Sequence, residues 1–263
     1  MLLESFGLRN LPPTDDYPFG LPLIQNLEQV KLRKRLTFFV GENGSGKSTI
    51  LEALAYAAAI PTAGGMSIEE DPFMQAARDL GKMLTLRFSE KTHAGFFTRA
   101  EDFFGFVKNI LRQIKDLDTE MAEVTANWTG GDLEKALAPI KAERKAFTDR
   151  YTDNLDAMSH GEGFLHFFNA RITGKGLYLI DEPEAALSPQ RQLSLISIIL
   201  NKLKTTDAQF IIATHSPIIM AIPDAQILAF KDGQISEIKY EETEHYQLTK
   251  MFLESPEAFL KEL

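Results

Sequence analysis

Short apolar runs alternate along the chain with stretches in which apolar residues recur at helical spacing. Residues 36–40 (LTFFV) are apolar and rich in aromatic and branched side chains, and Gly41 ends the run at once. This is typical of a buried strand that runs into a turn. From Ser48 the apolar residues recur at helical spacing until Pro61, so this region predicts a strand, a glycine-rich loop and a helix.

Four further segments have strand patterns. Residues 83–88 alternate like a half-buried strand, whereas residues 177–180, 210–213 and 227–230 are short and wholly apolar. A helical segment over residues 189–203 separates two of the apolar runs. Strands that are apolar on both faces and alternate with helices predict an α/β fold with a mostly parallel sheet covered by helices. We also expect antiparallel strands in the N-terminal part of the chain.

The middle of the chain has a purely helical pattern. Two apolar stripes predict two helices, joined by a turn at residues 128–131 and too short for a sustained heptad repeat. We therefore predict an inserted helical lobe over residues 99–158, between a first core part (1–98) and a second core part (159–263). The stripes consist of Phe103, Val107, Ile110, Ile114 and Leu117, and of Leu133, Leu137, Ile140, Phe147 and Tyr151.

Composition excludes several classes of protein. With 263 residues, 44% of them hydrophobic, the chain is long enough for a full globular core. The formal charge of −9 argues against electrostatic wrapping of nucleic acid by the whole surface. No cysteine is present, which excludes disulfides and thiolate sites. No apolar run reaches the length of a spanning helix and no secretory signal is evident, so we expect a cytoplasmic protein without membrane insertion.

The loop after the first apolar strand has the spacing of a phosphate-binding loop. Its glycines let successive backbone N–H groups point at phosphate oxygens, and the following helix adds its positive end. Lys47 would approach the β- and γ-phosphates, and the hydroxyl of Ser48 would bind Mg²⁺. The predicted nucleotide-binding residues are Gly41, Glu42, Asn43, Gly44, Ser45, Gly46, Lys47, Ser48 and Thr49.

Two later strands end in polar side chains. Asp181 and Glu182 follow the apolar run 177–180, and His215 follows the run 210–213. Carboxyl ends of parallel strands meet at one sheet edge, so we expect these side chains beside the phosphate loop. Asp181 would anchor hydrated Mg²⁺, Glu182 would orient or deprotonate the attacking water, and His215 would contact the γ-phosphate.

A small-residue stretch precedes another predicted helix at residues 164–170. Its residues Ser159 and Gly161 would expose N–H groups at the helix start, which is a weak anion-site signal. Its position in the chain, between the phosphate loop and the acidic strand end, strengthens the interpretation as an anion site.

The four motifs in this order resemble those of the ATP-binding-cassette (ABC) ATPase superfamily of P-loop NTPases. The resemblance implies that Lys47 and Ser48 belong to the Walker A loop, Asp181 and Glu182 to Walker B, and His215 to the switch. It likewise implies that Ser159 and Gly161 form the signature, which in this family touches ATP held by a second head. An ATP-dependent homodimer is therefore expected.

The details resemble the non-transporter branch, which includes SMC, RecF-like and overcoming-lysogenization-defect heads, more than transporter subunits. Three positions depart from the transporter pattern. His160 and Glu162 interrupt the signature, and Arg99 and Glu101 stand where a glutamine loop is expected. Ser188 occupies a position where many members have aspartate.

Several alternatives stay open. One aromatic side chain, Tyr17 or Phe19, could stack on the adenine ring. The alternative is that both belong to the hydrophobic core. The basic run 31–35 would contact a nucleic-acid backbone or be a solvated strand edge. The favoured function is a Mg²⁺-dependent ATPase that acts as a switch for DNA or an effector protein. The alternatives are a transporter's nucleotide-binding subunit and an ATP-gated scaffold with negligible turnover.

Overall fold

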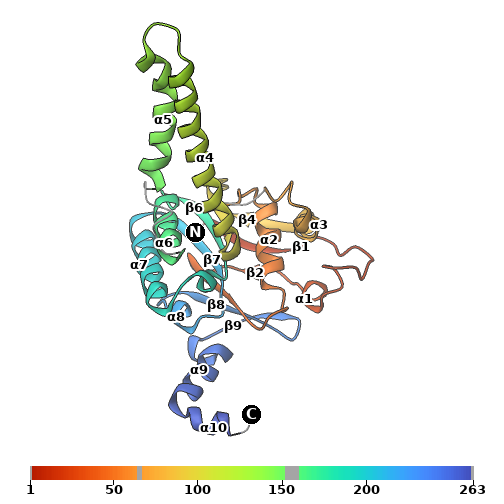
Figure 1. Ribbon diagram of the computed structural model, residues 1–263. Helices are drawn as coiled ribbons and strands as arrows, with labels where there is room; N and C mark the ends of the chain where they lie inside the picture. The colour runs from red at the N-terminus through yellow and green to blue at the C-terminus, as the bar shows by residue number, and fades with distance from the viewer. Residues whose placement is uncertain (1, 64–66, 152–159, 262–263) are drawn as a thin grey trace.

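The protein is described by a computed structural model that covers residues 2–63, 67–151 and 160–261. Two sheets form its framework (Figure 1). A six-stranded sheet has the order β5-β6-β7-β3-β8-β9, and a three-stranded sheet has the order β2-β1-β4. In the large sheet every neighbouring pair is parallel except β8 and β9, whereas the small sheet is antiparallel. The predicted α/β fold with a mostly parallel sheet is therefore confirmed.

The elements follow one another along the chain with these bounds. The strands are β1 (Leu3–Leu8), β2 (Val30–Lys31), β3 (Leu36–Val40), β4 (Leu84–Phe88), β5 (Gly95–Arg99), β6 (Gly176–Asp181), β7 (Ala208–Ala213), β8 (Gln226–Lys231) and β9 (Gln234–Ile238). The α-helices are α1 (Pro22–Gln25), α2 (Lys47–Ala57), α3 (Gln75–Met83), α4 (Ala100–Asn127), α5 (Leu133–Tyr151), α6 (His160–Arg171), α7 (Pro189–Thr205), α8 (Pro217–Met220), α9 (Glu244–Glu254) and α10 (Pro256–Leu260). Short 3₁₀ helices are η1 (Pro72–Met74), η2 (Pro183–Ala186) and η3 (Tyr240–Glu242).

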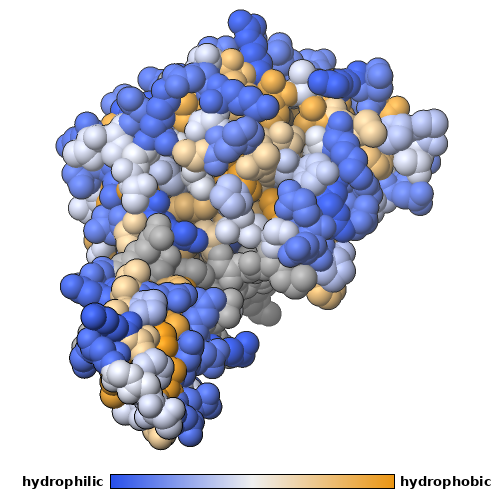
Figure 2. Space-filling model, turned by 90° about the horizontal axis from the view of Figure 1, so that it is seen from above, coloured by the Kyte–Doolittle hydropathy of each residue, from blue (hydrophilic) through white to orange (hydrophobic). Residues whose placement is uncertain are grey.

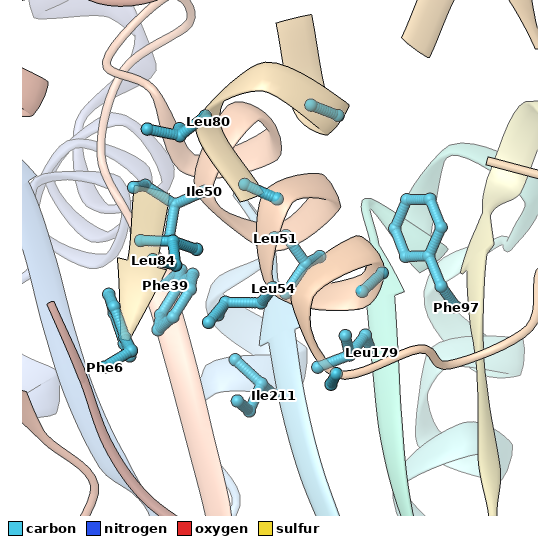
Figure 3. Packing of buried hydrophobic residues seen from close by; sticks show 14 of the residues in the cluster. Phe6, Phe39, Ile50, Leu51, Leu54, Leu80, Leu84, Phe97, Leu179 and Ile211 are labelled. Atoms are coloured by element: carbon cyan, nitrogen blue, oxygen red, sulfur yellow. The ribbon is translucent and has the colours of Figure 1, made fainter. Parts of the chain in front are cut away.

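Helix α2 is the centre of one core cluster, between the two sheets. Its side chains Ile50, Leu51 and Leu54 are fully buried and point toward Phe39 of β3 and Ile211 of β7 (Figure 3). This contact buries the apolar stripe of α2, which is the main driving force for a helix of this length. It also fixes the start of α2, and with it the phosphate loop, relative to the parallel strands.

The opposite face of the large sheet is covered by α6, α7 and α8. Phe96 of β5 meets the rings of Phe167 and Phe168 of α6 at centroid distances of 5.7 and 5.8 Å. Leu195 and Ile199 of α7 are fully buried in the same cluster. Both faces of the strands are thus apolar, as expected for a parallel sheet between helices.

Helices α4 and α5 form a hairpin that projects from the sheet region (Figure 1). The turn between them contains Trp128, whose Nε1 donates to the Gly131 carbonyl oxygen at 3.3 Å. Hydrophilic residues cover most of the face seen from the hairpin side (Figure 2). Among the described helices, none combines the length and the apolar content that a membrane crossing needs.

The start of β4 and the presence of β5 differ from the sequence prediction. Met83 ends α3, and β4 begins at Leu84. Strand β5 was not predicted, because Gly95–Arg99 runs directly into α4 without a turn residue to mark the boundary. Gly95 has φ 122°, and a Cβ there would lie within the Leu177 backbone of β6. This edge strand depends on that glycine, since no L side chain fits so close to β6.

Candidate functional site

The strand register brings three loops to one edge of the large sheet. Asp181, the last residue of β6, pairs with Ala213 of β7, and Ala213 pairs with Phe39 of β3. The loops that follow β3, β6 and β7 therefore leave the sheet side by side. This is the edge at which open α/β sheets bind their ligands.

The phosphate loop connects β3 to α2 through backbone conformations that require glycine. Gly41 has φ 147°, and a Cβ there would lie 2.4 Å from the Phe230 carbonyl oxygen. Gly46, the N-cap of α2, has φ 95°. Asn43 and Gly44 are exposed at the loop's outer side, and the loop amides precede the N-terminus of α2. This backbone geometry is suited to anionic phosphate groups.

Two polar side chains inside the loop fit a phosphate ligand. Lys47 is 3% exposed, and its Nζ donates to the carbonyl oxygens of Gly41 and Glu42 at 2.9 and 2.8 Å. Burial lowers the pKa of Lys47, against the opposing effect of Glu182 and other nearby carboxylates. The buried Oγ of Ser45 has no hydrogen-bond partner among the described residues. A phosphate oxygen would supply an acceptor for both donors.

Asp181 and Ser48 form the pair that fits Mg²⁺. Ser48 Oγ donates to Asp181 Oδ1 at 3.2 Å. Burial raises the pKa of Asp181 from 3.8 to about 7, the Ser48 hydrogen bond opposes the rise, and Glu52 and Glu182 add to it. No group of three or more His, Cys, Asp or Glu residues within the described ranges could hold a metal ion. One hydroxyl, one buried carboxylate and phosphate oxygens are the donors that a nucleotide-linked Mg²⁺ uses.

Glu182 lies in a strained backbone conformation beside the loop. Its φ of 47° and ψ of 54° are left-handed, and its N–H donates to the Ala213 carbonyl oxygen at 2.9 Å. Its side chain is 43% exposed and lines a cavity of about 280 Å³ together with Lys47 and Ser48. Strain of this kind at a non-glycine residue is typical of functional sites, where it aims a side chain at a ligand.

His215 follows β7 and faces Glu182. Its Nε2 lies 3.3 Å from Glu182 Oε1. Burial lowers the pKa of His215, the charge of Lys47 and the His245 ring lower it further, and Glu182 opposes the shift. The structure thus brings Lys47, Asp181 and His215, three of the sequence-predicted residues, to one site.

Glu184 is a carboxylate to which the sequence pattern assigned no role. Its Oε2 accepts from Thr214 Oγ1 at 2.8 Å, and its Oε1 accepts from the His215 N–H at 2.5 Å. Burial raises its pKa. Glu184 therefore holds the backbone of the loop that carries His215. The one available signal was its place in the acidic run 181–184.

His245, on helix α9, was also missed. Its Nε2 lies 2.8 Å from Nδ1 of His215, and the two rings are tilted edge to face with centroids 4.7 Å apart. Nothing in the local sequence marks this residue, because the contact joins positions that are 30 residues apart.

Arg99 occupies the place where a glutamine loop was expected. It forms an ion pair with Glu52 of α2 and lines a cavity together with Ser48, Asp181 and Glu182. The side chain of Glu101, the second candidate, lies outside the described part. An arginine–glutamate pair therefore stands next to the proposed metal ligands.

The predicted signature is described only in part. Ser159 lies outside the described residues, and Gly161 is buried in the first turn of α6. The predicted helix start at residue 164 was wrong, because α6 begins at His160. Glu162 forms an ion pair with Arg191 of α7 at 2.8 Å, which stabilises this first turn. A Cβ at Gly161 would meet the Arg191 side chain at 2.5 Å.

The two aromatic candidates for adenine stacking have different environments. Phe19 is 9% exposed and belongs to the core. Tyr17 is 64% exposed, and its hydroxyl lies 3.0 Å from Thr49 Oγ1 at the cavity beside the loop. The core interpretation is therefore right for Phe19 and wrong for Tyr17.

Two of the four basic residues in the run 31–35 have side-chain contacts within the chain. Arg33 pairs with Glu237 at 2.8 Å, and Arg35 donates to the Thr206 carbonyl oxygen at 2.8 Å. Leu32 between them is buried. These contacts favour a strand edge over a nucleic-acid surface.

Two protein families match the parts of the chain that form this site. Residues 19–67 match the family described as "AAA domain", and residues 162–221 match "AAA domain, putative AbiEii toxin, Type IV TA system". The first match contains the phosphate loop, and the second contains Asp181, Glu182 and His215. The hairpin lies between the two matches.

Among curated proteins, the chain is similar to the lipoprotein-releasing system ATP-binding protein LolD 1 of Chlorobium luteolum, with 24% identity over 89% of this chain and 93% of the relative. Among solved structures it is similar to an ATP-binding cassette of an ABC transporter, with a TM-score of 0.52, 18% identity and coverage of 96% and 97% of the two chains. It is also similar to a structure titled "putative metal-chelate type ABC transporter" (TM-score 0.51, 17% identity, coverage of 95% and 89%).

Both structural matches are below 25% identity and therefore concern the fold. The curated relative is named as an ATP-binding protein. Together with the order of the motifs along the chain, these findings support an ABC-type ATPase domain, to which this chain is similar in sequence and fold.

Proposed function

We propose that the protein hydrolyses ATP in a Mg²⁺-dependent reaction and uses ATP-dependent dimerisation as a switch for a partner protein or DNA. The observation that carries this proposal is the meeting of Lys47, Ser48, Asp181, Glu182 and His215 at one edge of the large sheet. A purely structural glycine turn would not need a buried lysine, a desolvated aspartate and a strained glutamate at the same place.

The role that we propose for each residue is supported by its position in the site. The loop amides and Lys47 hold the phosphates, and Ser48 and Asp181 would bind Mg²⁺. The metal, when bound, neutralises charge on the phosphate oxygens. Glu182 has its carboxylate in the cavity, where it orients a water molecule and accepts its proton. His215 presents its Nε2 beside Glu182, where it senses the γ-phosphate.

The openness of the site supports the proposed dimerisation. Glu182 is 43% exposed, so bulk water reaches the reaction centre of a single chain. A second copy that covers the ATP would exclude this water and strengthen the electrostatic contacts inside. The family resemblance assigns this role to the signature of the partner, which here includes Gly161. Closure of the two heads would be the signal passed to a partner.

The test is the variant Glu182→Gln, which keeps the side-chain shape and removes the base. We expect ATP affinity to stay near the parental value, turnover to fall by at least about 100-fold, and an ATP-dependent dimer to accumulate. Phosphate release, equilibrium binding of ATP and light scattering measure the three quantities. Glu254→Gln, on exposed α9, is the matched control. Parental turnover in Glu182→Gln would refute the role of Glu182.

A transporter subunit is the second candidate, because curated relatives include ATP-binding proteins of thiamine import and phosphonate import at 24% and 25% identity. Co-purification with a membrane-spanning protein would favour it. An ATP-gated scaffold is the third candidate, and the absence of phosphate release with and without DNA would favour it.

A further inference from the structure

The ring of His245 is in direct contact with the switch histidine. His215 Nδ1 and His245 Nε2 are 2.8 Å apart, which is a hydrogen-bond distance between two ring nitrogens. On the other side of the same ring, His215 Nε2 faces Glu182 Oε1 at 3.3 Å. His215 therefore lies between helix α9 and the glutamate that we propose as the base.

Several contacts hold His245 in this place. Tyr240 of η3 donates its hydroxyl to the Pro217 carbonyl oxygen at 2.8 Å, two residues after His215. Thr243 is 1% exposed and donates its Oγ1 to the Tyr240 carbonyl oxygen at 2.7 Å. The ring of Tyr246 packs on Tyr240 with centroids 4.6 Å apart. The start of α9 is thus fixed to the loop that carries the switch.

The contact selects one tautomer of His215. Burial lowers the pKa of both rings, so both are neutral at neutral pH. If His215 donated from Nδ1, its Nε2 would be a bare acceptor facing the Glu182 carboxylate, which is also an acceptor. If His245 donates from Nε2, His215 carries its proton on Nε2 and directs it toward Glu182. The second arrangement places a proton between His215 Nε2 and the Glu182 carboxylate, whereas the first places two acceptors opposite each other.

We propose that His245 is a positioning residue that donates a hydrogen bond to His215 Nδ1 and so keeps the proton of His215 on Nε2. This inference rests on the proposed function, because the Nε2 proton is the group that would meet the γ-phosphate. In the nucleotide-free protein the Nε2 of His215 faces Glu182 Oε1 at 3.3 Å without forming a hydrogen bond of good geometry, so its proton can turn to a phosphate oxygen when ATP binds. The C-terminal segment thereby becomes part of the ATP site.

The first experiment measures the tautomer without any need for activity. Long-range ¹H–¹⁵N spectra of nucleotide-free protein distinguish protonated from unprotonated ring nitrogens of His215. We expect the Nε2–H form in the parent, a mixed or Nδ1–H form in His245→Phe, and return of the Nε2–H form in His245→Gln, whose amide can donate from a similar position. His93→Gln, at an exposed histidine, is the control. A pure Nε2–H form in His245→Phe overturns the proposal.

The second experiment measures steady-state hydrolysis in the same variants. In His245→Phe we expect kcat to fall on the order of tenfold, as for loss of an orienting partner, with KM for ATP within about twofold of the parent. His245→Gln should recover most of the loss. An unchanged kcat in a folded His245→Phe, or no recovery by Gln when Phe reduces kcat, contradicts the positioning role.

The two experiments separate this inference from the proposed function. If the parent protein releases no phosphate, the hydrolysis proposal fails while the tautomer measurement still decides the role of His245. If His245→Phe does not fold, His245→Gln and His245→Asn decide in its place. Asn is too short to reach His215 Nδ1 from the same backbone position and should behave as the unpaired variant, whereas equal behaviour of Gln and Asn in both assays overturns the proposal.

Discussion

Replacing Asp181 by asparagine is expected to make the nucleotide-free protein more stable. Asp181 is buried at the end of β6, and its pKa rises from 3.8 to about 7 because burial disfavours the ionised form. The folded protein therefore keeps this proton in a pH range where the unfolded chain has released it. Because the folded state binds more protons there, the free energy of unfolding falls as pH rises from about 4 to about 7. An asparagine side chain has no such titration.

The size of the effect follows from the shift. A difference of about 3 pK units corresponds to about 4 kcal/mol once both states are ionised. At about pH 5 the unfolded aspartate is already ionised and part of this difference is present. The gap in unfolding free energy between Asp181→Asn and the parent should therefore widen by about 3 kcal/mol between about pH 5 and about pH 8.

Urea unfolding of the nucleotide-free protein at the two pH values measures this gap. Asp207→Asn, at an exposed aspartate just before β7, is the control and should follow the parent at both pH values. The same experiment with Mg²⁺ and ATP at about 100 times the dissociation constant should stabilise the parent by about 2.7 kcal/mol. The Asp181→Asn variant should lose most of this gain. A gap that does not change with pH would refute the reasoning on Asp181.

Two further substitutions test other parts of the site. Gly41→Ala should lower the thermal midpoint and abolish ATP binding, because its Cβ would lie 2.4 Å from the Phe230 carbonyl oxygen. Gly44→Ala should lower the free energy of unfolding by only about 1 kcal/mol, since a Cβ there meets nothing within 4 Å. Calorimetry and ATP titration measure both variants, and equal effects would contradict this reasoning. Glu184→Gln should reduce turnover on the order of tenfold at nearly unchanged ATP affinity, because it weakens the hold on the His215 loop; parental turnover would exclude that role.

Local patterns in the sequence determined the central part of the fold. The apolar runs that became β3, β6, β7 and β8 are buried on both faces, so each was recognisable without its neighbours. The phosphate loop was recognisable because its glycine spacing is a local requirement of the backbone. The lobe helices were predicted from their apolar stripes, and the boundaries of the lobe itself stay a prediction.

The sequence also determined which strand ends carry polar side chains, and the rule for parallel sheets predicted that these ends would meet. That rule depends on topology and needs no side-chain detail. Asp181, Glu182 and His215 could therefore be predicted as neighbours from the sequence alone.

Only the tertiary structure decided the contacts between elements that are distant in sequence. The hydrogen bond between His245 and His215, the hydrogen bond of Glu184 to the backbone of His215 and the ion pair of Arg99 with Glu52 all join different elements. Such contacts are set by how helices and strands are packed, which no local pattern encodes. The same holds for the raised pKa of Asp181, because desolvation is a property of the assembled core.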